Sequence, residues 1–328
     1  MAELVYATDS KPVPARVEGS TPSSGTTYMK KLLVLVLLVL VLPLGADAKT
    51  APTETPLEKA TVNVFCRMKV GGATFQTTGT GSFVDSRGII ITNAHVAQYF
   101  LLASSTNAKS KNRCSIRTGS PAKEAYHAEL LYMPLSWTEQ YQGKVSTKTE
   151  GKGSGASDFA LLYITDAKLG TVFPALPLNT VTTPNMPVSI AGYPADKLDF
   201  DGVKSKLKRI VASSTVTEIR SFTKPNQDIL LVAPSKAGHK GVSGGPVVDT
   251  SGALVGIATT IGGDKNKDLV SLRALTTNNI DRTIRAETGF SLSSILTGDV
   301  QTRAALTELA LPKDMRKTLE TVLRRLRS

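Results

Sequence analysis

The chain has 328 residues, and its 39 lysines and arginines outweigh 27 aspartates and glutamates to give a formal net charge of +12. Hydrophobic residues make up 41% and charged residues 20%, which is typical of a globular protein and too apolar for a disordered one. Two cysteines, the lack of a sustained short repeat and a single long apolar run exclude a disulfide scaffold, a coiled coil and a multi-pass membrane protein.

The apolar run, residues 32–42, contains only leucine and valine. Lys30 and Lys31 precede it, and an A-x-A sequence ending at Ala48 follows it. This order predicts a secretory signal peptide over residues 29–48, cleaved after Ala48. A membrane anchor is the alternative, but a spanning helix needs roughly 20 apolar residues and the run is much shorter.

The polar residues 1–28, rich in proline, serine and threonine, precede the signal. We expect translation to begin at Met29, so that this segment is not made, or else is disordered. Export to the periplasm or the outside places Cys66 and Cys114 in an oxidising compartment, where a disulfide between them is favoured over two buried thiols.

The net positive charge favours acidic partners, and it serves solubility equally well. No run of basic residues is interleaved with aromatic ones, so we expect no nucleic-acid partner.

Residues 49–59 are rich in proline and threonine and are expected to form a flexible lead. From 60 to 278, short runs of strand-forming residues alternate with turn residues, which predicts an all-β domain. Residues 138–157 are polar and predict a surface loop. The expected strands are 61–70, 81–84, 88–92, 125–133, 159–164, 187–192, 208–219, 229–232, 247–248 and 253–260.

The segment 279–328 favours helix. Its last part carries apolar residues at spacings of four and three, which predicts a helix with one apolar face: Leu311, Met315, Leu319, Leu323 and Leu326. Docking of this face on the β-domain is the favoured interpretation. The alternative is contact of the basic helix with an anionic membrane surface or a partner.

The segment Gly241–Pro246 reads G-V-S-G-G-P. Its glycines let the backbone turn tightly around Ser243, and they let the N–H groups of Gly241 and Ser243 point at one spot, as a developing oxyanion requires. A plain glycine-rich turn is the alternative for this segment alone. It also matches the G-x-S-x-G motif of α/β-hydrolases, but there the catalytic histidine follows the serine. All three histidines here, at 95, 127 and 239, precede Ser243.

His95 follows an apolar strand, whose end is a rigid place for a general base. Asp158 precedes another apolar strand and is expected to be partly buried, which suits a carboxylate that orients an imidazole. Taken singly, each residue has a structural alternative, a core or capping histidine and a turn aspartate. His127 is interpreted as structural and His239 as an exposed loop residue or a pocket rim. Neither has metal-ligand spacing, and no metal or cofactor is expected.

Four segments in this order resemble the chymotrypsin-like serine peptidases, closest to the bacterial trypsin-like and HtrA-type branch: Thr78–Val84, Thr92–Val96, Asp158–Leu162 and Gly241–Pro246. The resemblance covers about residues 60–275. It implies two six-stranded antiparallel β-barrels, with residues 279–328 as a helical C-terminal extension. It further implies an exported endopeptidase that hydrolyses polypeptides through a His95–Asp158–Ser243 triad and an acyl-enzyme, with Gly241 and Ser243 as oxyanion hole.

Three departures limit the resemblance. Val242 stands where digestive members carry the aspartate that accepts a new N-terminus, so no zymogen switch of that type is implied. Ala237 replaces the acidic pocket floor of trypsins, so cleavage after arginine or lysine is not supported. Residues 279–328 are too few for a PDZ domain. The competing hypothesis for function is a catalytically inactive binding module on the same fold.

Overall fold

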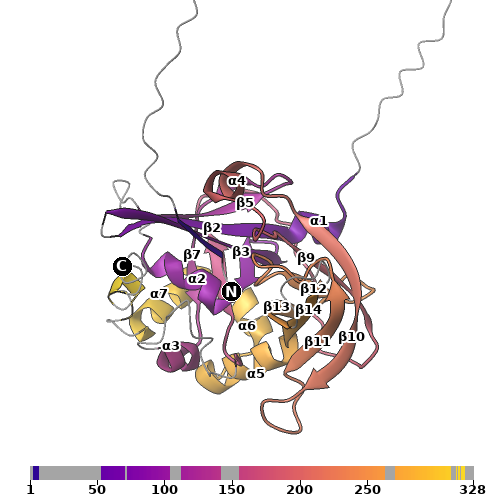
Figure 1. Cartoon of the computed structure of the whole chain (residues 1–328). Helices are drawn as coiled ribbons and strands as arrows, with labels where there is room; N and C mark the ends of the chain where they lie inside the picture. Colours follow the sequence, from indigo (N-terminus) through magenta and orange to yellow (C-terminus); the bar gives the residue numbers. More distant parts are fainter. Residues whose placement is uncertain are drawn as a thin grey trace, which may run out of the picture. The chain divides into compact units, whose positions relative to one another are not determined.

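Two β-sheets make up most of the computed structural model (Figure 1). The structure describes residues 3–6, 53–70, 72–103, 112–141, 155–262, 270–311, 315, 317 and 319–321.

The first sheet has eight strands and carries the path β6-β5-β2-β3-β4-β8-β7, with β1 paired to β3. All its pairs are antiparallel. The long strand β3 is buried from Phe75 to Val84, because its two faces are both covered. The strands are β1 (Glu3–Tyr6), β2 (Thr61–Val70), β3 (Ala73–Asp85), β4 (Ile89–Thr92), β5 (Arg113–Thr118), β6 (Lys123–Tyr126), β7 (Ala128–Tyr132) and β8 (Ala160–Ile164).

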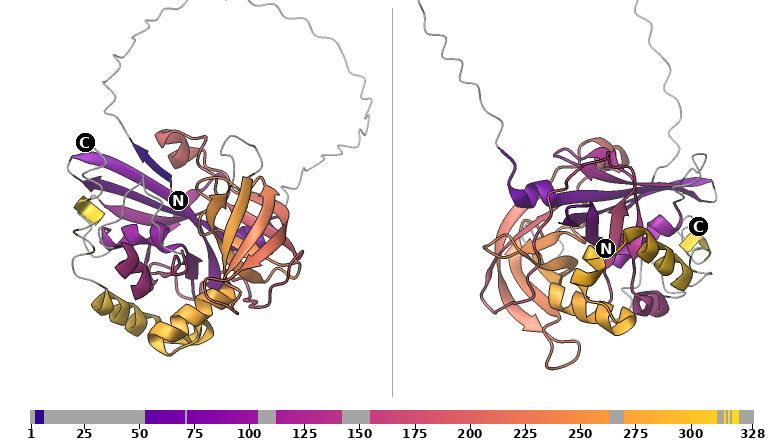
Figure 2. Two further views of the ribbon diagram at one scale, coloured as in Figure 1. Left: turned by 60° about the horizontal axis from the view of Figure 1, so that its bottom comes forward. Right: turned by 180° about the vertical axis from the view of Figure 1, so that it is seen from behind.

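The second sheet is a closed six-stranded antiparallel barrel in the order β10-β11-β14-β13-β12-β9. Figure 2 shows it in orange beside the purple first sheet. Its interior is packed mainly with valine, leucine, isoleucine and alanine. The strands are β9 (Pro187–Gly192), β10 (Ile210–Arg220), β11 (Ile229–Ser235), β12 (Pro246–Val248), β13 (Leu254–Gly262) and β14 (Val270–Thr276).

The second sheet is thus one of the two antiparallel β-barrels expected from the sequence. The fold is chymotrypsin-like, but among the described residues the first sheet stays open between its end strands β6 and β7. β6 and β7 follow one another in the chain, with only His127 between them. His127 donates its N–H to the Asp166 carboxylate, and its carbonyl accepts the N–H of Thr165. The backbone at this corner thus bonds to residues that follow β8.

Short helices connect the strands, and three helices follow the second barrel. The connecting elements are α1 (Pro56–Ala60), α2 (Ala94–Ala97), the 3-10 helix η1 (Gln98–Leu101), α3 (Leu135–Tyr141) and α4 (Phe200–Ser205). The last three are α5 (Thr277–Thr288), α6 (Leu292–Thr297) and α7 (Val300–Ala310). Helix α3 takes the first residues of the loop expected at 138–157, because a carboxylate from α5 caps it, as described below.

The C-terminal apolar face docks on the first sheet. Leu311, Met315 and Leu319 are buried in the core cluster that fills this sheet, which confirms the docking interpretation for these three residues. Leu323 and Leu326 lie outside the described residues. Within the described part of the chain, no helix is both long and apolar enough to cross a membrane.

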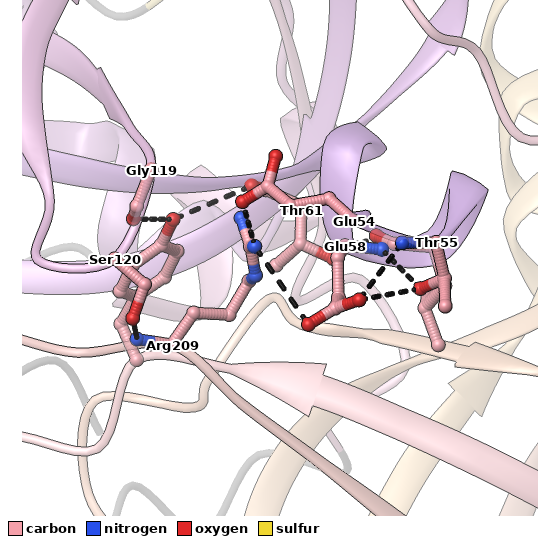
Figure 3. A network of polar contacts seen from close by, with 9 residues as sticks. Glu54, Thr55, Glu58, Thr61, Gly119, Ser120 and Arg209 are labelled. Atoms are coloured by element: carbon pink, nitrogen blue, oxygen red, sulfur yellow. Dashed lines mark hydrogen bonds and ion pairs between the residues drawn. The ribbon is translucent and has the colours of Figure 1, made fainter. Parts of the chain in front are cut away.

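The segment before β2 is tied to the barrel side of the molecule by charge (Figure 3). Helix α1 starts with a capping box between Thr55 and Glu58. The Arg209 guanidinium hydrogen-bonds Glu54 and lies 3.9 Å from the Glu58 carboxylate. Arg209 also bonds the phenol of Tyr193, which in turn donates to the carbonyl of Gly119. These residues overlap the lead expected at 49–59, so part of that segment forms the helix α1.

A disulfide joins Cys66 on β2 to Cys114 on β5. The two residues are directly paired in the sheet register, so the bond links neighbouring strands. The pairing expected from the sequence is therefore present.

Replacing both cysteines with alanine is expected to lower the free energy of unfolding by about 2–4 kcal/mol. The bond spans 48 residues of sequence, and a cross-link of that length removes considerable loop entropy from the unfolded chain. Urea unfolding of the oxidised protein and the double variant measures the loss. Reduced wild type is the control, since it keeps both sulfur atoms. Equal midpoints for oxidised and reduced wild type would contradict the expectation.

Candidate active site

His95 and Asp158 form a hydrogen-bonded pair where strand β4 ends and strand β8 begins. His95 lies in the short helix α2 directly after β4, and Asp158 lies two residues before β8. The imidazole Nδ1 is 2.7 Å from Asp158 Oδ2, and the His95 backbone N–H donates to Oδ1 at 3.0 Å. Since β4 and β8 are adjacent antiparallel strands, their pairing brings the two residues together. His95 Nε2 is buried and has no hydrogen-bond partner within the described residues.

Two further groups fix the Asp158 segment. The Thr259 hydroxyl, from β13 of the second barrel, donates to Asp158 Oδ2 at 3.0 Å. The Asn93 side-chain amide donates to the Asp158 backbone carbonyl at 2.8 Å. Burial acts to raise the pKa of Asp158, but the His95 charge and the hydrogen bonds from His95 and Thr259 outweigh it and hold the pKa below its ordinary value. Asp158 is therefore a buried, ionised carboxylate aimed at an imidazole.

Glu287 of helix α5 binds the segment that packs next to this pair. The Glu287 carboxylate accepts the backbone N–H groups of Leu135 and Ser136, so it caps the start of α3. It also accepts the Ser136 hydroxyl, which hydrogen-bonds Ser157 Oγ at 2.7 Å, next to Asp158. Hydrogen bonds through the Ser136 and Ser157 hydroxyls thus connect α5 to the residue next to Asp158.

Ser243 lies in the loop between β11 and β12, within two consecutive turns. The Val242 N–H donates to the carbonyl of His239 at 3.3 Å, and the Gly245 N–H donates to the carbonyl of Val242 at 2.8 Å. The third residue of each turn is a glycine with positive φ, Gly241 at 95° and Gly244 at 83°. This is the geometry of type II turns, which require glycine there.

The serine loop is held by β3 of the first sheet and β13 of the second barrel. Thr80 on β3 donates its N–H to the Ser243 carbonyl at 2.8 Å, and the Gly244 N–H donates to Ala258 at 2.7 Å, one residue before Thr259. A Cβ on Gly244 would lie 2.3 Å from Thr92 Oγ1, just ahead of the His95 helix, so only glycine allows this approach. The structure thus places all three predicted residues at one junction of sheet and barrel.

The predicted oxyanion donor at Gly241 has a defined orientation. The Lys240 carbonyl accepts the Ala195 N–H at 2.8 Å. The Lys240–Gly241 peptide is trans, so its N–H points opposite to its carbonyl and therefore away from Ala195.

The remaining predicted positions are also placed. Ala237 is fully buried ahead of the serine loop, and Val242 packs closely against Gly192. His239 pairs with Asp196 at 2.9 Å and is largely buried rather than exposed. His127 is more exposed and pairs with Asp166 at 2.7 Å. The described residues contain no group of three side chains able to hold a metal ion.

A model described as "Trypsin-like peptidase domain" matches residues 79–257, more than half of the chain, and contains His95, Asp158 and Ser243. The chain belongs to the trypsin-like peptidase family. No curated protein matches it by sequence.

Two solved structures of one mycobacterial protein are similar to this trypsin-like peptidase. The active form of the Rv3671c protease from M. tuberculosis shares 17% identity over 70% of this chain and 80% of its own, with a TM-score of 0.44. An inactive serine-to-alanine form of Rv3671c from M. tuberculosis H37Rv shares 16% over 71% of this chain and 88% of its own, with a TM-score of 0.43.

Proposed function

We propose that this trypsin-like peptidase is a serine endopeptidase in which Ser243 is the nucleophile and His95 and Asp158 complete a catalytic triad. The observation that carries the proposal is the buried His95–Asp158 hydrogen bond, 2.7 Å long, at the junction where the serine loop is anchored. Such a pair is the general-base half of a serine hydrolase.

In the proposed reaction, Ser243 Oγ attacks a peptide carbonyl while His95 Nε2 takes its proton. The Oγ–C bond forms, and the C–N bond then breaks as His95 returns the proton to the leaving amine. Asp158 keeps the proton of the neutral imidazole on Nδ1, so Nε2 is available as the base, and it stabilises the cation that follows. Water repeats these steps on the acyl-enzyme and releases the second product.

Negative charge on the attacked oxygen needs donors, and the N–H groups of Gly241 and Ser243 fill this role in the proposal. The anchored Lys240 carbonyl supports it, because that contact turns the Gly241 N–H away from Ala195.

Substrate choice follows from the residues around the loop. The buried Ala237 puts no carboxylate in the pocket floor, so we do not expect preference for arginine or lysine. Export is part of the proposal, supported by the signal-like residues 29–48 and by the Cys66–Cys114 disulfide.

Labelling with a fluorescent fluorophosphonate tests the proposal. An activated serine displaces fluoride and forms an Oγ–P bond, so we expect label on wild type, mapped to Ser243 by peptide mass spectrometry, and none on Ser243→Ala. A folded wild-type protein that takes up no label would favour the inactive binding module instead.

A further inference from the structure

Thr80 is the point where the first sheet holds the serine loop. It lies on β3, is fully buried, and belongs to a segment that carried the family resemblance. Its backbone N–H donates to the Ser243 carbonyl at 2.8 Å. Its hydroxyl donates to the Gly241 carbonyl at 2.7 Å and accepts the Tyr193 N–H at 3.0 Å. A threonine hydroxyl has one proton and two lone pairs, so these two bonds are compatible.

These contacts fix both peptide groups that flank Gly241. The Lys240–Gly241 peptide is held by its carbonyl against Ala195, and the Gly241–Val242 peptide is held by its carbonyl against Thr80. Gly241 has a φ of 95°, and because glycine lacks a Cβ its backbone can adopt other conformations if an anchor is lost. Of these two anchors, the Ala195 N–H belongs to the backbone and the Thr80 hydroxyl belongs to a side chain.

Loss of this hydroxyl would leave a buried carbonyl without a donor. Gly241 is buried, so water cannot replace the bond without opening the loop. An unsatisfied buried acceptor is costly, and this cost favours rotation of the peptide toward another partner. Such a rotation turns the Gly241–Val242 peptide and shifts the Gly241 Cα, and this shift displaces the adjoining Lys240–Gly241 peptide, which carries the Gly241 N–H.

We propose that Thr80 is a positioning residue for the proposed hydrolysis: its buried hydroxyl, by holding the Gly241 carbonyl, keeps the Gly241 N–H directed at the oxyanion. The inference rests on the proposed function, since it assigns Thr80 a role in that same site. Thr80 does not contact the reacting atoms, and its effect passes through the Gly241 backbone.

The test measures the rate of fluorophosphonate labelling at Ser243, separated into the limiting rate and the concentration for half-maximal rate. We expect Thr80→Val, which keeps the shape and removes the hydroxyl, to lower the limiting rate roughly 10- to 100-fold with the half-maximal concentration unchanged. Thr80→Ser retains the hydroxyl and should remain within about threefold of wild type. If Thr80→Val does not fold, Thr80→Ala takes its place.

Thr78→Val is the matched control. Thr78 is buried on the same strand, but its hydroxyl bonds Asn63 within the first sheet and does not contact the loop. A hydroxyl-free Thr80 variant that labels at the wild-type rate overturns the proposal, as does an equal slowing by Thr78→Val or by Thr80→Ser. Absence of label on wild type itself would instead refute the proposed function.

Discussion

Ser243→Ala is expected to lower kcat for peptide-bond hydrolysis by roughly 10⁴- to 10⁶-fold. Removing the nucleophile of a catalytic triad leaves only the contribution of binding and the oxyanion donors. The substitution deletes one oxygen and leaves in place the described anchors of the loop, which involve its backbone and the residues Thr80, Ala195 and Ala258, so the fold should persist. Release of fluorescent peptides from labelled, unfolded casein measures the loss.

Ser293→Ala is the control for this substitution, because Ser293 is exposed in α6 and far in sequence from the loop. It should retain wild-type turnover. Turnover of Ser243→Ala within tenfold of wild type would show that another residue performs the attack.

Asp158→Asn is expected to lower kcat by roughly 10⁴-fold. The carboxylate accepts both the imidazole Nδ1–H and the His95 backbone N–H, whereas an amide can donate to Nδ1 and so favour the wrong tautomer. Steady-state hydrolysis of a p-nitrophenyl ester measures the loss in kcat.

The chain supplies a matched control in Asp166→Asn. Asp166 holds His127 with the same two contacts, 2.7 Å to Nδ1 and 2.9 Å to the backbone N–H, but on the exposed side of the first sheet. It should leave kcat unchanged. Equal losses in the two variants would mean that the effect is structural and not specific to the site.

Stability should also reveal the charge of Asp158. Its pKa in the folded state lies below its ordinary value of about 3.9, so ionisation stabilises the native state above that pH. That contribution is lost as the pH falls through the folded-state pKa. The difference in free energy of unfolding between wild type and Asp158→Asn should therefore be larger at pH 6 than at pH 3, as measured by urea unfolding. A difference that grows toward acid would contradict the assignment.

Strands that carry a local pattern could be predicted closely from the sequence. The expected 61–70 and 187–192 coincide with β2 and β9. Strands β5 and β14 were missed because their sequences mix charged and apolar residues; β14 is stabilised by neighbours on both sides, β11 and β13. Helix α3 was missed for a related reason, since its cap, Glu287, comes from far along the chain.

In the candidate site too, residues in a local motif could be predicted, and residues that act through distant contacts could not. His95, Asp158 and Ser243 could be proposed because each stands in a short recognisable segment. Thr259 and Glu287 could not, because a threonine in an apolar strand and a glutamate on a helix have many ordinary explanations. Their significance comes from long-range contacts with Asp158 and with Ser136 that only folding creates.

The attachment of Glu54 and Glu58 to Arg209 has a practical consequence for protein production. A shortened recombinant chain that starts at residue 60 would delete both acidic side chains and leave the shielded guanidinium with only Tyr193 of the partners described above. The Tyr193 backbone N–H also donates to the Thr80 hydroxyl, which holds the Gly241 carbonyl. A change in the position of Tyr193 would therefore act directly on the residue that anchors Gly241. An expression boundary upstream of Glu54 preserves that connection.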